Sequence, residues 1–132
     1  MSELEPEWLL KEVVQSFHDQ QLREHGGGHG MRDQSMLDSA LNKPIQMWHY
    51  QEPKPDIPTL AGAYAFGLAN NHPYVDGNKR TAAIACEVFL LLNGYGFTVG
   101  EAEKYPHYIA LASGEHTQES FTIWLIENTQ LL

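Results

Sequence analysis

Apolar side chains recur every three or four residues in several stretches of the chain, which is the spacing of one face of an α-helix. In the first stretch, 7–24, the apolar positions are Leu10, Val13, Val14 and Phe17. Polar side chains occupy most other positions, so we predict an amphipathic helix. His18 adjoins the apolar stripe, and we interpret it as a partly buried structural residue rather than a catalytic one. Three successive glycines at 26–28 predict the end of this helix.

Two later stretches predict a pair of packed helices. Residues 59–71 are rich in alanine and include Gly62 and Gly67, each of which costs a helix roughly 1 kcal/mol relative to alanine. Such a cost is understandable where another helix approaches closely. The obvious partner is 79–93, which is apolar on nearly every side apart from Glu87. We therefore predict a central, buried helix hairpin, whose second helix ends at Asn93 and Gly94.

Shorter patterns predict the remaining helices. Asp33 or Ser35 is a suitable cap for a short helix containing Met36, Leu37, Ala40 and Leu41. Residues 101–113 predict another helix, interrupted or restarted at Pro106. Thr117 is a suitable cap for a last helix with Phe121, Trp124 and Leu125 facing inward. Because no stretch sustains the alternation of a strand, we predict an all-α fold of about six helices in a single domain, 1–132.

The segment 42–58 differs in composition from the predicted helices. It contains four prolines and the sequence Met47-Trp48-His49-Tyr50. A functional loop and a disordered insertion both have this kind of composition. Two interpretations stay open for the aromatic residues: they dock a partner protein, or Trp48 and Tyr50 fold back to cover the core.

Length and charge exclude several classes of protein. The 132 residues suffice for one hydrophobic core, and the longest apolar run is too short to span a bilayer. The acidic start of the chain is not a signal peptide. The single cysteine, Cys86, lies in the predicted buried helix, which indicates a small core residue in a cytoplasmic protein. The net charge of −9 argues against a nucleic-acid binder, which needs clustered Lys and Arg.

The candidate chemistry lies at 72–80, where the sequence reads His-Pro-Tyr-Val-Asp-Gly-Asn-Lys-Arg. We expect a turn that leads into the buried helix, with Asn78 as its cap. The first N–H groups of a helix have no intrahelical partner, so together with Gly77, Lys79 and Arg80 they suit a phosphate. Asp76 can hold a divalent cation, and His72 can accept a proton from a hydroxyl. These groups are the components of phosphoryl transfer.

Two other interpretations concern this segment and the histidines beside the glycines. Residues 72–78 can be only a polar turn at the start of a core helix, although such a turn needs neither His72 nor the two cations. His25 and His29 flank the glycines and suggest a metal site, but no third ligand is fixed near them.

The nine residues resemble the signature of the Fic/Doc (Fido) family, His-Pro-aromatic-x-Asp/Glu-Gly-Asn-Gly/Lys-Arg, and every constrained position is matched. Members that transfer AMP usually carry a second arginine three residues after the first, where this chain has Ala83. They also have glycine where this chain has Lys79. Both differences resemble the Doc (death-on-curing) branch. The stretch from His18 to Asp33 also resembles the N-terminal part of that branch.

The resemblance implies a compact helical fold with an extended flap at 42–58 beside the active site, where Met47, Trp48, His49 and Tyr50 dock the target. It implies a toxin of a toxin–antitoxin module that transfers the γ-phosphate of ATP to a Ser or Thr hydroxyl, with elongation factor Tu as target. His72 is then the general base, Asp76 binds Mg²⁺, and residues 77–80 hold the phosphates. The resemblance implies a Phd-like antitoxin as a partner. It implies no direct binding to nucleic acid or to a membrane.

Three alternatives stay open. Fic-type members transfer AMP rather than phosphate, and Asn70 stands where we expect an arginine in Doc, which leaves the orientation of the nucleotide undecided. The chain can also be an inactive module that only binds a nucleotide or a partner. A metal-dependent hydrolase that uses His72, Asp76 and a histidine near the glycines is a further possibility. An inhibitory helix motif ends at Glu127 and Asn128, but Ile123 replaces its Ser or Thr, so we predict no autoinhibition.

Overall fold

The computed structural model describes residues 4–132, which form six helices and one two-stranded ribbon. The helices are α1 (Lys11–His25), α2 (Gln34–Tyr50), α3 (Ile57–Asn70), α4 (Asn78–Leu92), α5 (Glu101–Ser113) and α6 (Gln118–Asn128). The ribbon pairs β1 (Tyr95–Phe97) with β2 (Thr129–Leu131) in antiparallel fashion. The predicted helical fold is confirmed; strands of three residues are too short to show an alternating pattern. None of the helices in the described part combines the length and apolar character needed to cross a membrane.

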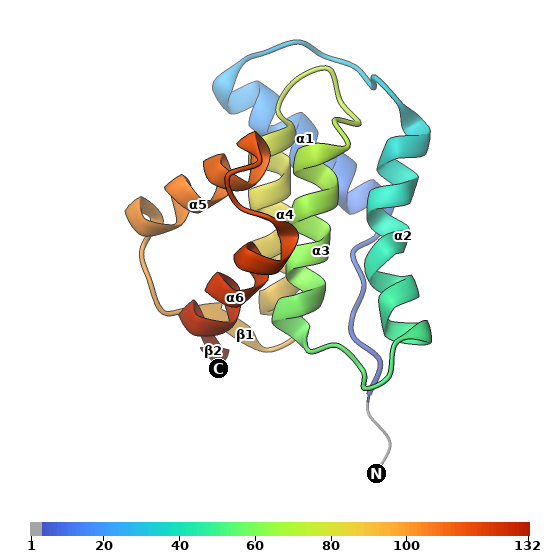
Figure 1. Cartoon of the computed structure of the whole chain (residues 1–132). Helices are drawn as coiled ribbons and strands as arrows, with labels where there is room; N and C mark the ends of the chain where they lie inside the picture. The colour runs from blue at the N-terminus through green and yellow to red at the C-terminus, as the bar shows by residue number, and fades with distance from the viewer. Residues whose placement is uncertain (1–3) are drawn as a thin grey trace.

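Helices α3 and α4 form the predicted central hairpin, and the other helices pack around it (Figure 1). Leu60, Tyr64 and Leu68 of α3 are completely buried, as are Cys86 and Phe89 of α4. Burial raises the pKa of the Cys86 thiol to about 12, so the thiol stays protonated at neutral pH. Cys86 is therefore a core residue, as its position in the sequence indicated.

The two glycines of α3 allow close approach by helices other than α4. A Cβ atom at Gly67 would lie 2.9 Å from the Cβ and 3.1 Å from the Cα of Ala40 in α2. A Cβ at Gly62 would lie 2.5 Å from Oγ1 of Thr122 in α6. The prediction that these glycines make room for the second helix of the hairpin is therefore wrong. They allow α6 to pack closely at Gly62 and α2 to pack closely at Gly67.

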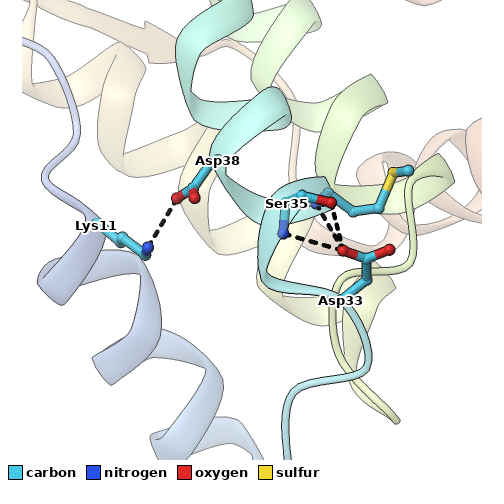
Figure 2. Close-up of polar contacts among 5 residues, drawn as sticks. Lys11, Asp33, Ser35 and Asp38 are labelled. Carbon is cyan, nitrogen blue, oxygen red and sulfur yellow. Dashed lines mark hydrogen bonds and ion pairs between the residues drawn. The ribbon is translucent and has the colours of Figure 1, made fainter.

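Helix α2 begins at the cap that the sequence indicated. One carboxylate oxygen of Asp33 accepts hydrogen bonds from the backbone N–H groups of Ser35 and Met36 and from the Ser35 hydroxyl (Figure 2). An ion pair of 2.7 Å between Lys11 and Asp38 links the start of α1 to α2 (Figure 2). Both side chains are partly exposed, so this pair contributes little to stability.

Helix α2 is much longer than the short helix predicted from the sequence, because it continues through Pro44 to Tyr50. Pro44 lacks the N–H of an intrahelical hydrogen bond, but it lies on the buried face of α2 with Leu41 and Met47. Burial of that face against α3 holds the helix together across the proline. The two interpretations of 42–58 as a loop or as a disordered insertion are therefore wrong for 42–50.

The expected flap at Met47, Trp48, His49 and Tyr50 is also wrong, because these residues form the last turn of α2. Met47 and Trp48 are buried in the core, as the second interpretation held for Trp48, whereas Tyr50 is 84% exposed. This end of α2 lies at the opposite end of the bundle from the loop that joins α3 to α4 (Figure 1). A turn of helix at that distance cannot act as a flap beside the site.

Helix α5 runs through Pro106 without interruption, and its packing rests on a buried lysine. Nζ of Lys104 lies 2.8 Å from Glu87 of α4 and 2.6 Å from Glu101. Burial by itself would lower the pKa of Lys104, but the hydrogen bonds and charges of the two carboxylates outweigh it, so the pKa is raised. Tyr108 donates a second hydrogen bond to Glu87. Glu87, the one charged residue within 81–92, thus holds α5 against α4 through Lys104 and Tyr108.

Two histidines connect α5 to α6. Nδ1 of His107 lies 2.8 Å from Nε2 of His116, whose Nδ1 lies 2.7 Å from the hydroxyl of Ser120. The His107 ring also stacks on Trp124, with ring centroids 4.1 Å apart. A hydrogen bond between two imidazoles needs one nitrogen without a proton, so the contact requires that the two rings are not both charged.

We predict that Gly67→Ala destabilises the fold. Alanine is the better helix former by about 1 kcal/mol, but the new methyl group collides with the methyl group and Cα of Ala40 in α2, and overpacking costs about 1–3 kcal/mol. Chemical denaturation should therefore give a lower free energy of unfolding for the variant. The added substitution Ala40→Gly removes the colliding methyl group and should restore part of the loss. A Gly67→Ala protein at least as stable as the wild type would contradict the close contact.

We also predict that acid weakens the connection between α5 and α6. Burial, and then the charge of His116, lower the pKa of His107 below 6.5. Between the two pKa values the unfolded chain binds more protons than the folded one, so stability falls as the pH falls through that window. The melting temperature should drop from about pH 7.5 to about pH 5.5, and less so in His116→Gln, which cannot become charged. Equal drops in both proteins would count against this contact.

Candidate active site

The segment 72–80 forms the loop between α3 and α4 and the first turn of α4, at one end of the bundle (Figure 1). The Asn78 side chain closes this loop: its Oδ1 accepts from the Tyr74 N–H, and its Nδ2 donates to the Tyr74 carbonyl, both at 3.0 Å. The cap position belongs to Gly77, which has a left-handed backbone and no side chain to offer. The prediction that Asn78 caps α4 is therefore wrong.

This arrangement leaves the start of α4 open. Within residues 4–132, no acceptor pairs with the backbone N–H groups of Asn78, Lys79 or Arg80. Three N–H groups directed from a helix start, with the positive end of its dipole, form a site for an anion. Gly77 is suited to this place because its φ of +81° favours glycine and because a Cβ there would overlap the buried Gln21 side chain.

The Asp76 carboxylate is held from two sides. Its Oδ1 accepts from the Gly77 N–H at 2.8 Å, and its Oδ2 accepts from the Gly28 N–H at 3.3 Å. Gly28 belongs to the glycine-rich loop that follows α1. Each oxygen keeps acceptor capacity, because a carboxylate oxygen has two lone-pair directions. The carboxylate is thus oriented but exposed.

His72 has an unusual backbone and a free side chain. Its φ of +50° lies in the left-handed region, which few residues other than glycine adopt. Arg32 stabilises this turn, because its guanidinium donates to the carbonyls of Asn71 at 2.9 Å and His72 at 2.6 Å. The exposed imidazole has no hydrogen-bond partner in the described part of the chain. A ring that is exposed and unpartnered is available to accept a proton.

The loop between α1 and α2 lies against the 72–76 loop, as Figure 1 shows at the end of the bundle. Met31 and Tyr74 form an isolated antiparallel bridge, and the Val75 N–H donates to the Gly30 carbonyl at 3.1 Å. The backbone N–H groups of Arg32 and Asp33 both donate to the Pro73 carbonyl. The glycine-rich loop is therefore the extended segment beside the site, a place the sequence prediction gave to 42–58.

A cavity of about 580 Å³ unites the candidate residues. His72, Asp76, Gly77, Asn78, Lys79 and Arg80 all line it. The opposite wall comes from α5 and consists of Tyr105, Tyr108, Ile109, Ala112 and Ser113. Burial, together with the neighbouring Cys86 and Glu87, raises the pKa of Tyr108, so this wall carries no charge at neutral pH.

The charge of the cavity is opposite to that of the whole chain. Lys79 and Arg80 are exposed, and neither forms an ion pair with any residue from 4 to 132. The chain as a whole has a net charge of −9. Two uncompensated cations beside an open helix start therefore concentrate positive charge at one point, which suits a phosphorylated ligand.

A sequence pattern that describes the Fic/DOC family matches residues 8–90, which is more than half of the chain. The chain belongs to the Fic/Doc family. The match covers α1, the glycine-rich loop and the loop between α3 and α4, and it ends near the end of α4. The α5 wall of the cavity lies outside the matched residues.

Two curated members of the Fic/Doc family are similar to this chain. Toxin Doc of Mycolicibacterium smegmatis is 37% identical over 89 residues, which cover 64% of this chain and 68% of that protein. Protein kinase doc of Escherichia phage P1 is 29% identical over 94 residues, which cover 71% of this chain and 70% of that protein. Both names support the predicted Doc branch of the family.

The structure also bears on residues near the site that the sequence left open or did not assign. His25 and His29 do not belong to a metal-binding group, since no three His, Cys, Asp or Glu side chains gather in this way within 4–132. The α5 wall was missed from the sequence, although Tyr105, Ile109 and Ala112 recur at helical spacing. Arg32 and Gly28 lie in the stretch 18–33 that resembles the Doc branch. Their contacts with His72 and Asp76 join residues 40 and 48 positions apart, so no local pattern predicts them.

We predict that Gly27→Ala disturbs the Asp76 carboxylate of this Fic/Doc site. A Cβ at Gly27 would lie 2.9 Å from Oδ2 of Asp76, whereas a Cβ at Gly26 would meet nothing within 4 Å. Both glycines have positive φ, so both alanine variants lose some stability. Only Gly27→Ala should shift the backbone amide resonances of Asp76 and Gly77 in a ¹H–¹⁵N NMR spectrum. Equal shifts in both variants would show that strain alone is responsible.

Proposed function

We propose that this chain is a Doc-like toxin that transfers the γ-phosphate of ATP to a Ser or Thr hydroxyl of another protein. The observation that supports this most strongly is the cavity in which a free imidazole, an oriented carboxylate and an open helix start with two unpaired cations meet. Its volume of about 580 Å³ lies within the usual range of roughly 300–1,000 Å³ for small-molecule sites.

In the proposed mechanism, His72 accepts the proton of the target hydroxyl while the hydroxyl oxygen attacks the γ-phosphorus. The bond from that phosphorus to the oxygen bridging the β- and γ-phosphates breaks, and ADP leaves with the electron pair. The N–H groups of residues 78–80, with the side chains of Lys79 and Arg80, bind the phosphates and stabilise the charge that develops. Most of the catalysis comes from this fixed set of donors, because loss of one typically raises the barrier by about 2.7–4 kcal/mol. A well-placed base contributes roughly 10²–10⁴-fold.

Mg²⁺ fits this donor set. Among residues 4–132, Asp76 is the only carboxylate that lines the cavity, and magnesium is commonly held by one or two carboxylates together with the phosphates of its nucleotide. Asp76 is the residue that would hold the ion. When bound, Mg²⁺ would neutralise charge on the phosphate oxygens.

Transfer of phosphate is favoured over transfer of AMP by the position of Ala83. This residue lines the cavity at the place where AMP-transferring members have a second arginine, so the cavity lacks that charge. The name of the phage relative, Protein kinase doc, agrees with this choice. The α5 wall suits the sugar and base, because Tyr105, Ile109 and Ala112 offer apolar surface opposite the cations.

We propose elongation factor Tu as the cytoplasmic target and a Phd-like antitoxin as the regulator. The relative from Mycolicibacterium smegmatis is named a toxin. The resemblance to the Doc branch implies a separate antitoxin. Regulation from within the chain finds no support in α6, because Ile123 offers no hydroxyl group to an inhibitory motif that ends at Glu127.

The experiment that tests this function is mass spectrometry of elongation factor Tu after incubation with the chain, ATP and Mg²⁺. We expect the target to gain phosphate on a Ser or Thr. A gain of adenylate would reject the kinase and support the AMP-transferring alternative. An unmodified target, together with binding of ATP, would support an inactive binding module instead.

Three variants assign the roles. His72→Ala should slow transfer by about 10²–10⁴-fold, since it removes the base. Lys79→Ala should slow it by about 10²–10³-fold, since it removes one donor of the phosphate site. Lys43→Ala removes an exposed lysine of α2 and serves as the matched control, with an unchanged rate expected. If His72→Ala transfers as fast as the wild type, the proposed mechanism is wrong.

A further inference from the structure

His18 lies in the middle of α1, outside the 580 Å³ cavity, and is only 3% exposed. Its ring stacks almost parallel on the ring of Tyr74, with centroids 3.6 Å apart and an angle of 8° between the planes. Its Nε2 lies 2.8 Å from the backbone carbonyl oxygen of Asp76. A carbonyl oxygen can only accept a hydrogen bond. Nε2 is therefore the ring nitrogen that carries hydrogen, and it donates the hydrogen bond to the Asp76 carbonyl.

This hydrogen bond directly restrains the main chain of Asp76. The neighbouring residues are held in other ways: Tyr74 by the Asn78 side chain, and Val75 by the Gly30 carbonyl. Within 4–132, no other donor reaches the Asp76 carbonyl. Without His18 the peptide between Asp76 and Gly77 can rotate, which would move both the carboxylate and the Gly77 N–H that orients it.

We propose that His18 is a positioning residue for the candidate metal site, which acts by fixing the Asp76 peptide. The proposal rests on the function proposed above, in which Asp76 holds Mg²⁺. His18 does not act on the substrate itself, because its ring is buried and its Nε2 is already bonded. The partners that orient a metal ligand typically account for 10- to 100-fold in metal affinity.

The stacking partner and the hydrogen bond have separable effects. Tyr74 fixes the plane of the imidazole, while its own buried hydroxyl finds no acceptor within the described residues. Phenylalanine at 18 keeps an aromatic ring against Tyr74 but cannot donate. Glutamine at 18 loses the ring, but its amide nitrogen takes the approximate place of Nε2. His18→Phe therefore removes the donor, and His18→Gln restores it.

The experiment measures Mn²⁺ binding to the full chain by electron paramagnetic resonance, with a non-hydrolysable ATP analogue at saturation. We expect His18→Phe to weaken Mn²⁺ binding on the order of 10- to 100-fold, as is typical for loss of such a partner. His18→Gln should recover most of the affinity. Leu125→Ala, a core change in α6 away from the loop, controls for a general loss of stability and should bind Mn²⁺ like the wild type.

A second readout separates positioning from folding. In the transfer assay, His18→Phe should need more Mg²⁺ for half-maximal rate and should recover most of its kcat at saturating Mg²⁺, whereas a purely structural defect would lower kcat at every concentration. If His18→Phe does not fold, His18→Asn takes its place, because its amide is too short to reach Asp76.

Several outcomes would overturn the inference. They are wild-type Mn²⁺ affinity in His18→Phe, an equal loss in Leu125→Ala, or no Mn²⁺ binding by the wild type. A wild type that binds Mn²⁺ in a His18-dependent manner but modifies no protein would reject the proposed transferase and leave the role of His18 intact. If His18→Phe transfers phosphate with the same Mg²⁺ requirement as the wild type, the role of His18 is rejected and the proposed transferase stands.

Discussion

The open start of α4 is the constraint on which the rest of the site depends. A helix usually satisfies its first N–H groups with a capping side chain, and Asn78 is a residue type that often takes that role. Here its amide is used to close the preceding loop through Tyr74. The loop thereby becomes rigid without consuming the donors of the helix, and Gly77 leaves their approach unobstructed. The loop is closed and the N–H groups of the helix start stay available to an anion, because the Asn78 side chain bonds to Tyr74, which precedes it in the chain.

The packing around the hairpin brings the walls of the cavity together. Close contacts at Gly62 and Gly67 set α6 and α2 against α3, and α4 follows from α3 through the closed loop. Glu87 then determines where α5 lies, because Lys104 and Tyr108 both bind it. A charge inside an otherwise apolar helix stretch thus has a structural reason. It holds the uncharged α5 wall at the same cavity that Lys79 and Arg80 line.

The sequence predicted those parts of the molecule that depend on neighbours along the chain. Helix periodicity and the caps at Asp33 and Thr117 are local patterns, and both caps were found where expected. The failures concern distant contacts. Pro44 belongs to a segment that was interpreted as a loop or an insertion. Burial of α2 against α3 outweighs the intrahelical hydrogen bond that a proline cannot form. The Asn78 side chain can bond either to the first N–H groups of α4 or to the preceding loop. Only the folded structure shows that it bonds to Tyr74 in the loop. His18 was correctly interpreted as buried, but its bond to Asp76 joins residues 58 positions apart.

The bridge between Met31 and Tyr74 carries a consequence for how this protein is made. Contacts between the glycine-rich loop and the loop between α3 and α4 join residues 40 or more positions apart, and α5 closes the cavity only after a further stretch has been added. Long separations of this kind delay assembly, because the intervening chain must be ordered first. A nascent chain on the ribosome therefore has the helices of the hairpin before the cavity is complete, because α5 is the last element along the chain that lines it.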